Sequence, residues 1–168
     1  MTATALSSFE ESLAALDVPV TRTTAVAAED DIAALVESPA VGTAVSVDDV
    51  TLPEQVSTAL TPSRLEAAAT GVTGADLAIG DYGSVVVAGG ADGAEHVSLF
   101  ADTHVAVVAA SDVVASMREG VGALGDEIRD GLSSAVLATG PSATADMGEL
   151  VTGAHGPTEV HVLLVTDR

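Results

Sequence analysis

The spacing of apolar residues predicts alternating helices and strands in the first part of the chain. A first helix is indicated by apolar residues three or four positions apart, namely Leu6, Phe9, Leu13 and Leu16. Ser7 and Glu10 have the spacing of a capping box in this helix. A strand over 18–23, a helix over 27–36 with acidic first turns, and a strand over 41–47 are predicted to follow.

The pattern changes in the middle of the chain, where glycine-rich turns separate short β-branched runs. Pro53 opens a predicted helical turn that Pro62 closes. Strands are expected after it over 77–79, 84–88 and 95–100, with the turn Gly89–Gly93 between the last two. Such turns between β-branched runs are typical of hairpins, so we predict an antiparallel element here.

Three apolar runs in the last part of the chain predict buried strands, over 104–110, 133–139 and 160–165. Ser111 is the expected N-cap of a helix whose apolar face consists of Val114, Met117, Val121 and Leu124. Strands that alternate with helices predict an α/β fold with an open, mostly parallel sheet flanked by helices, to which the antiparallel hairpin is added. With no repeat or linker, 1–168 is expected to form one domain.

Composition removes whole classes of function. The 168 residues contain 25 acids and 5 arginines, for a formal charge of −20, and this balance excludes a nucleic-acid binder. The chain has no cysteine, so thiol nucleophiles, thiolate-ligated clusters and disulfides are excluded within it. It also has no lysine, which excludes Schiff-base chemistry and a lysine general base. No separate cofactor is predicted from the motifs.

The acid excess has a second implication, for the medium in which the chain folds. With 48% apolar residues the chain is too hydrophobic to be disordered, so its carboxylates must repel one another on a folded surface. Abundant counterions screen such repulsion, and we expect a salt-adapted protein. The first residues resemble no export signal and no long apolar segment is present, so a cytoplasmic location without membrane insertion is predicted.

Candidate binding residues follow a predicted strand in the segment Gly140–Asp146. Gly140, Ser142 and Thr144 combine a tight turn with two hydroxyls, and they are candidates for binding a small anion through backbone N–H groups. The alternative is an ordinary strand-to-helix turn in which Ser142 or Thr144 is the N-cap. Three other short segments follow strands or lie in irregular chain: Thr73–Asp76, Asp81–Ser84 and Gly153–Pro157.

His155 is the strongest candidate for acid–base chemistry, because it lies between glycines and only histidine titrates near neutral pH unperturbed. Asp81 and Asp146 are the accompanying acid–base candidates. Gly83, Ser84 and Gly156 complete the predicted ligand-binding residues. The alternative for His155 is a structural role that stabilises its loop. The residues at Asp81 are also those that a turn favours for local conformational reasons. The four histidines form no recognised metal signature, so no metal is predicted.

The ordered motifs resemble the lactate-utilization protein C family, whose common region is the LUD domain. The resemblance covers residues 70–166 and fits 1–65 loosely. Its motifs are Thr73 with Ala75-Asp76, Ala78-Ile79, Asp81-Tyr82-Gly83-Ser84, Ser98-Leu99, His104, Ser111-Asp112, Gly140-Pro141-Ser142, Thr144-Ala145-Asp146, Gly153-Ala154-His155-Gly156-Pro157 and His161. The chain departs from the family at Tyr82, Ala101 and Ala143, where threonine, proline and arginine are usual. Without that arginine, binding of an anion would depend on backbone N–H groups, or on Arg118 or Arg129.

The resemblance implies a fold similar to the sugar-phosphate isomerase and coenzyme A transferase superfamily. It also implies an accessory role in oxidising L-lactate to pyruvate, with partner proteins that carry iron-sulfur centres. The lack of cysteine fits this division of labour. The alternative function is a stand-alone enzyme or binding protein for a small carboxylate, sugar phosphate or acyl thioester. A third is a homo-oligomerisation module without a ligand.

Overall fold

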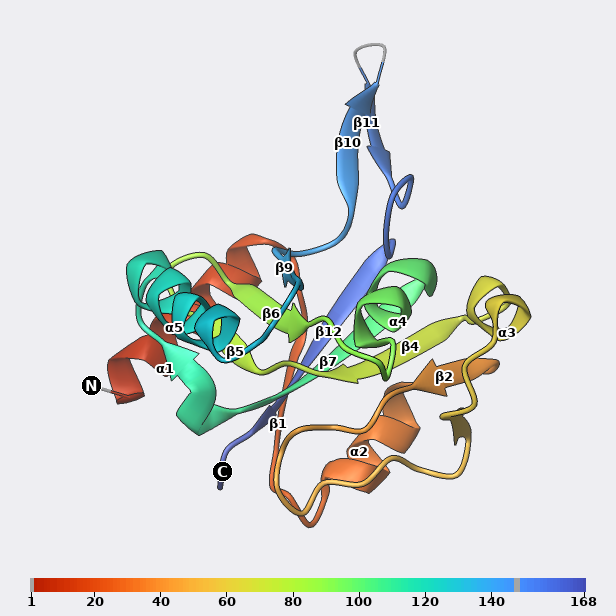
Figure 1. Cartoon of the computed structure of the whole chain (residues 1–168), viewed down its shortest axis with the longest axis horizontal. Coiled ribbons are helices and arrows are strands. Elements are labelled where there is room, and N and C mark those ends of the chain that lie inside the picture. Colours follow the sequence, from red (N-terminus) through yellow and green to blue (C-terminus); the bar gives the residue numbers. More distant parts are fainter. Residues whose placement is uncertain (1, 147–148) are drawn as a thin grey trace.

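A six-stranded parallel sheet forms the centre of the computed structural model, which describes residues 2–146 and 149–168 (Figure 1). Its strand order is β1-β12-β7-β4-β2-β3. The strands are β1 (Val20–Thr23), β2 (Ala40–Gly42), β3 (Val56–Ser57), β4 (Thr70–Gly74), β7 (Thr103–Ala109) and β12 (Glu159–Val165). The predicted α/β fold with a mostly parallel sheet is therefore confirmed.

Two smaller sheets accompany the central one. In the first, β8 (Val113–Val114), β5 (Leu77–Ile79), β6 (Ser84–Ala88) and β9 (Ala135–Ala138) lie side by side in that order. In the second, β10 (Ala143–Asp146) and β11 (Glu149–Thr152) form an antiparallel hairpin that stands away from the rest of the molecule (Figure 1). The predicted antiparallel element is thus present, as the β5–β6 hairpin.

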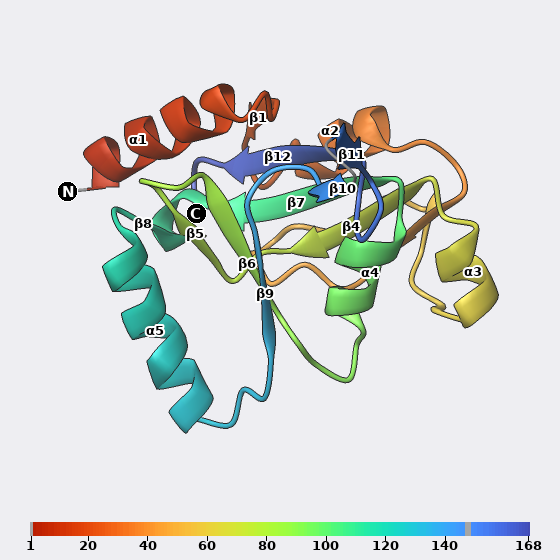
Figure 2. The ribbon, with the colours of Figure 1, turned by 90° about the horizontal axis from the view of Figure 1, so that it is seen from above.

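Both faces of the central sheet are covered, which explains the continuous apolar runs of its inner strands. The helices are α1 (Thr2–Ala15), α2 (Ala28–Leu35), α3 (Pro62–Glu66), α4 (Ala94–Phe100) and α5 (Met117–Arg129). On β7, Val105 and Val107 pack in the cluster that contains Ile32 of α2. Ala106 and Val108 point to the opposite face and pack with Phe9 of α1 and with the β5–β6 hairpin. Figure 2 shows α1 and α5 at the same end of the molecule.

The segment 95–100 is a helix and the prediction of a strand there was wrong. Val97 and Ala101 are buried, and α4 packs directly on β4 at Gly71. A Cβ atom on Gly71 would lie 2.5 Å from the carbonyl oxygen of Val97, so glycine permits this close approach. The helix begins after Gly93, whose φ is 80°. The local pattern suggested a strand. Burial of one helical face against the sheet made the segment a helix instead.

Four further features differ from the predictions. Pro62 opens α3 behind the N-cap Thr61 instead of closing a helical turn, and β3 occupies part of 53–60. The helix expected from Ser111 begins at Met117, after the 3₁₀ helix η1 (Ala110–Asp112) and β8. The segment after Gly140 leads into β10 and not into a helix. Ser7 lies inside α1, which begins at Thr2, so the expected capping box does not start that helix.

Candidate functional site

The carboxyl ends of the central strands meet at one edge, because all six strands run in parallel. Asp76 follows β4 at this edge, and Asp112 follows β7 in η1. The loop after β2 brings Ser46 to the same place, within 2.9 Å of where a Cβ atom on Gly74 would lie. Open α/β sheets bind their ligands at the carboxyl ends of strands. The topology thus places two carboxylates at the position typical of a ligand site.

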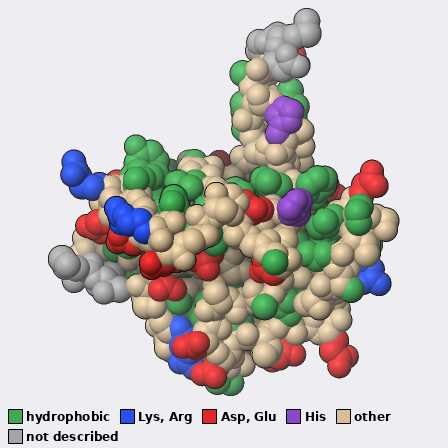
Figure 3. Space-filling model, viewed as in Figure 1, with side chains coloured by type: hydrophobic (Ala, Val, Ile, Leu, Met, Phe, Trp, Pro, Cys, Tyr) green, Lys and Arg blue, Asp and Glu red, His purple; other side chains and the backbone are tan. Residues whose placement is uncertain are grey.

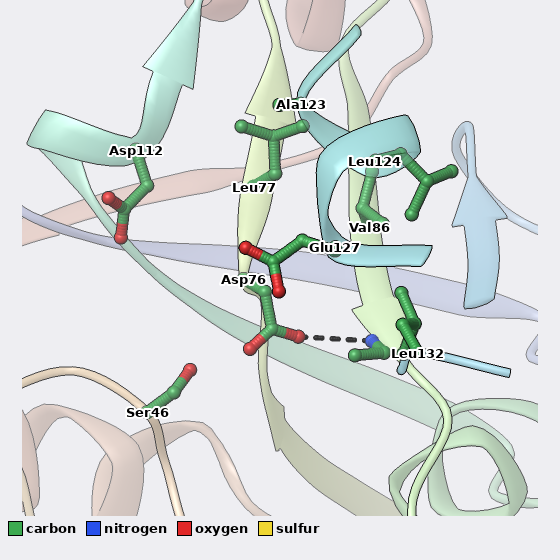
Figure 4. Close-up of a pocket in the computed structure, with 10 residues that line it drawn as sticks. Ser46, Asp76, Leu77, Val86, Asp112, Ala123, Leu124, Glu127 and Leu132 are labelled. Carbon is green, nitrogen blue, oxygen red and sulfur yellow. Dashed lines mark hydrogen bonds between the residues drawn. The ribbon is translucent and has the colours of Figure 1, made fainter. Parts of the chain in front are cut away.

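A cavity of about 350 Å³ opens at this edge (Figure 4). Its apolar walls come from the small sheet and from α5, and its polar rim carries one hydroxyl and three carboxylates. The lining residues are Ser46, Asp76, Leu77, Val86, Ala88, Asp112, Ala123, Leu124, Glu127 and Leu132. Asp76 is held in place because its Oδ2 accepts a hydrogen bond of 3.0 Å from the backbone N–H of Ala88. The carboxylates thus reach the cavity from separate elements.

The charge of this cavity selects against anions. Burial raises the pKa of Asp112; a hydrogen bond from Ser111 lowers it, and the nearby charge of Asp76 raises it further. No arginine is among the residues that line the cavity. A free carboxylate such as lactate would therefore meet like charges there, whereas a cationic or neutral group would not.

The loops predicted to bind a ligand come together at the opposite edge of the sheet, just before β12. The backbone N–H of Ser142 donates to the carbonyl oxygen of Pro157 at 2.8 Å, and that of Gly153 donates to the carbonyl oxygen of Ser142 at 2.9 Å. A groove of about 360 Å³ runs between the two loops and α4, and Gly140, Ser142, His155 and Gly156 line it together with Leu99. The structure thus brings four of the predicted site residues into one place.

Asp81 and Gly83 lie outside this groove, in the turn between β5 and β6. Asp81 Oδ1 accepts a hydrogen bond of 3.0 Å from the backbone N–H of Met117, so the carboxylate caps the start of α5. Gly83 has a φ of 64° and packs against α1. These positions have structural reasons for their residues, as the turn chemistry alone suggested.

The remaining predicted residues connect the groove to the rest of the fold. Ser84 is buried, and its hydroxyl is 2.6 Å from that of Thr139, next to the groove. Thr144 lies on β10, in the hairpin that rises beside the groove. Asp146 ends the same strand, and its side chain lies outside the part of the chain that the structure describes. In the described ranges no cluster of three or more His, Asp or Glu residues is suited to a metal ion.

Two other histidines sit in the central sheet. His104 on β7 is fully buried, and its Nε2 is 2.9 Å from the hydroxyl of Thr73. Burial lowers the pKa of His104 to about 4, so its ring is neutral at pH 7. Burial also lowers the pKa of His161 on β12, whose Nε2 is 2.8 Å from the hydroxyl of Thr21. Both rings therefore act as neutral structural groups.

The sequence predicted only part of the cavity at the carboxyl ends of the central strands, the carboxyl-edge cavity. Thr73–Asp76 was recognised as a segment beside a strand end, yet Asp76 was not among the predicted site residues. Asp112 belonged to the family resemblance without an assigned role. Glu127 gave no signal, because an acid on an exposed helix position is ordinary. The described part of the chain contains no helix long and apolar enough to cross a membrane.

Comparison with known proteins agrees with this architecture. "Lactate utilization protein C" of Bacillus licheniformis is 35% identical over 109 residues, which are 62% of this chain and 45% of that protein. The protein of the same name from Deinococcus radiodurans is 37% identical over 109 residues, covering 63% and 50% of the two chains. The chain thus spans about half the length of the curated relatives that it matches.

A solved structure resembles the whole chain. The crystal structure of a DUF162 family protein from Deinococcus radiodurans superposes with a TM-score of 0.75 at 25% identity, over 98% of both chains. The family model described as LUD domain matches residues 6–165. Because that match runs from α1 to β12, this protein belongs to the LUD domain family.

Proposed function

We propose that this protein is an accessory subunit in the oxidation of L-lactate to pyruvate and acts with iron-sulfur partner proteins in the cytoplasm. Its membership of the LUD domain family and its relatives named "Lactate utilization protein C" support a role in lactate utilization. The chain has no cysteine with which to bind a cluster itself. Electron transfer is therefore assigned to the partners.

The acidic rim of the carboxyl-edge cavity is the observation that carries the accessory role. A lactate dehydrogenating site must hold the carboxylate of its substrate, and arginine is the usual residue for this. Here Asp76, Asp112 and Glu127 surround the cavity instead. The groove beside His155 also has no arginine among its lining residues. Neither place offers the arginine that usually holds such a carboxylate, which favours a subunit that assembles or positions its partners.

Deletion of the chain is expected to abolish growth on lactate while growth on pyruvate continues. Pyruvate bypasses the step in which the protein is proposed to act, so it is the matched control. The tagged chain, purified from its native cytoplasm at high salt, should bring down cysteine-rich proteins with the visible absorbance of iron-sulfur clusters. Unchanged lactate oxidation in the deletion strain would refute the accessory role.

A stand-alone enzyme or binding protein is the second candidate, and the groove that joins Ser142, His155 and Gly156 favours it. An exposed histidine in a groove suits acid–base chemistry on a small carboxylate, sugar phosphate or acyl thioester. The purification separates the two candidates, because a colourless chain without partners supports this second function.

We also propose that the protein is salt-adapted. No acidic side chain in the described residues is fully buried, so the carboxylates repel one another across a solvated surface. Transfer from concentrated to dilute salt is expected to reduce the far-ultraviolet circular dichroism, and restored salt should recover it. A spectrum that is the same at both salt concentrations would show that screening is not needed.

A further inference from the structure

The carboxyl-edge cavity combines an apolar wall with an acidic rim. Leu124 and Leu132 line it and are each only partly buried, so the cavity exposes apolar surface. Figure 4 shows both leucines on one side of the Asp76 carboxylate, while Asp112 lies on the other side. The cavity therefore suits an occupant that has an apolar body and a positively charged end.

The three carboxylates of this cavity, Asp76, Asp112 and Glu127, lack a cationic partner. None of them takes part in the ion pairs that the described residues form. Asp76 is exposed, and the hydrogen bond from the backbone N–H of Ala88 fixes its position. Burial raises the pKa of Asp112, and the charge of Asp76 adds to this rise. A cation placed beside both carboxylates would relieve their repulsion.

The apolar wall distinguishes between two kinds of cation. A metal ion uses carboxylate oxygens and has no use for an apolar wall. In residues 2–146 and 149–168 no group of three or more acids or histidines is suited to a metal ion. A lysine or arginine side chain, in contrast, buries its methylene stem on apolar surface and keeps its charge at the far end. Such a side chain matches both parts of the cavity lining.

A second copy of this chain is a poor source of that side chain. The chain contains no lysine, and its formal charge of −20 makes two copies repel each other. Three of its five arginines, Arg22, Arg129 and Arg168, already form ion pairs with acids of their own chain. Figure 3 shows acidic side chains spread over the visible face, with few basic ones among them. A different protein with an exposed basic residue is complementary to this surface.

We propose that the carboxyl-edge cavity receives a lysine or arginine side chain of a partner protein. The stem of that side chain lies against Leu124 and Leu132, and its charged end lies among the three carboxylates. Arginine is enriched among the residues that carry most of the binding energy at protein interfaces. This inference rests on the proposed accessory role, for which it names the surface that meets a partner.

Binding of a blocked peptide to the full chain at high salt tests this contact. The probe is acetyl-Ala-Lys-Ala-amide, and its control is the same peptide with norleucine, which keeps the stem and lacks the charge. Nuclear magnetic resonance titration should show shifts at the amide signals of Leu77, Val86 and Ala123, which line the cavity. The norleucine peptide should bind at least about fivefold more weakly, because it loses the opposite-charge contact.

Two variants separate the space of the cavity from its charge. Ala123→Leu fills the cavity and keeps every carboxylate, and it should weaken binding of the lysine peptide at least about fivefold. Ala34→Leu, the same change at an exposed position of α2, should have no effect. Asp112→Asn should also weaken binding, whereas Asp30→Asn on α2 should not. Circular dichroism establishes that all four variants are folded.

The tagged chain links the cavity to the partners themselves. Purified from its native cytoplasm, Ala123→Leu should recover at least about fivefold less iron-sulfur protein than Ala34→Leu, because the filled cavity cannot receive the side chain. Equal recovery by the two variants, or equal binding of the lysine and norleucine peptides, would overturn the proposal. Binding of free 1,5-diaminopentane without binding of the lysine peptide would also overturn it, since the occupant would then be a small amine.

Failure of this inference is distinguishable from failure of the accessory role. If deletion of the chain abolishes growth on lactate and the lysine peptide does not bind, the accessory role stands and the cavity is not its docking site. If the peptide binds at the cavity and the deletion strain still oxidises lactate, the accessory role is refuted. The docking of a lactate-utilization partner is then refuted with it.

Discussion

Phe9→Ala is expected to lower the free energy of unfolding by about 3–5 kcal/mol, the range for removing a large buried aromatic side chain. Phe9 is 0% exposed and lies on the inner side of α1, where it packs with residues of β7, β12 and the β5–β6 hairpin. The alanine variant loses this apolar contact and leaves a cavity, because α1 and the sheet are each held by other residues and cannot fully close the gap. Urea unfolding at high salt measures the difference.

Tyr82→Ala is the control for this effect. Tyr82 is also aromatic and is close to α1 in the β5–β6 turn, but it is 54% exposed. Its replacement should cost about 1 kcal/mol or less, as surface substitutions usually do. Equal losses for the two variants would show that α1 does not contribute to the core as its burial indicates. Such a result would also question the packing of α1 on the sheet.

The second large effect concerns acid. Below pH 6.5 the unfolded chain binds a proton on His104, whereas the folded chain does so only near pH 4, because burial lowers the pKa of His104 to about 4. Between these values the unfolded state binds more protons, so the stability falls as pH is lowered, by about 1.4 kcal/mol per pH unit. Over the whole window the loss is about 3 kcal/mol. Above pH 6.5 His104 is neutral in both the folded and the unfolded chain, so none of this stability is lost there.

His104→Gln is expected to remove this dependence, since glutamine does not titrate and its amide can still bond to Thr73. Urea unfolding at several pH values from about 4.5 to about 6.5, which lie between the two pKa values of His104, gives the dependence of the unfolding free energy on pH for each protein. His155→Gln is the control, because it makes the same substitution at an exposed histidine. The proposal fails if the slope of His104→Gln equals that of the unsubstituted protein.

The inner strands β7 and β12 of the central sheet were predictable because of their burial, whereas β4 was not predicted and β3 lies in a segment expected to be a helical turn. The run 104–110 is apolar at successive positions because β7 is covered on both faces, and 160–165 is apolar for the same reason in β12. The segment 95–100 was predicted wrongly because its conformation depends on contact with Gly71, which is distant in sequence. Local patterns carry no information about such a contact.

The candidate sites also divide into residues that the local sequence predicts and residues that depend on contacts distant in sequence. The loops at Ser142 and His155 were singled out by their turn residues, and the structure joins them through backbone hydrogen bonds. Asp81 has the same kind of local sequence but caps α5, a role that depends on where the turn lies relative to that helix. The carboxyl-edge cavity needed Glu127 from α5 beside Asp76 from the sheet. Only the packing of α5 on the small sheet creates that neighbourhood.

The position of β12 in the sheet has a consequence for synthesis on the ribosome. β12 lies between β1 and β7, so β1 is joined to the sheet only through a strand that comes after all the others in the chain. Until residues 159–165 have left the exit tunnel, β1 has no neighbour with which to pair, and the apolar side of α1 lacks the part of its cover that β12 provides. Until then the nascent chain carries exposed apolar residues on α1 and β1. Binding by a chaperone during that interval would be directed to α1 and β1.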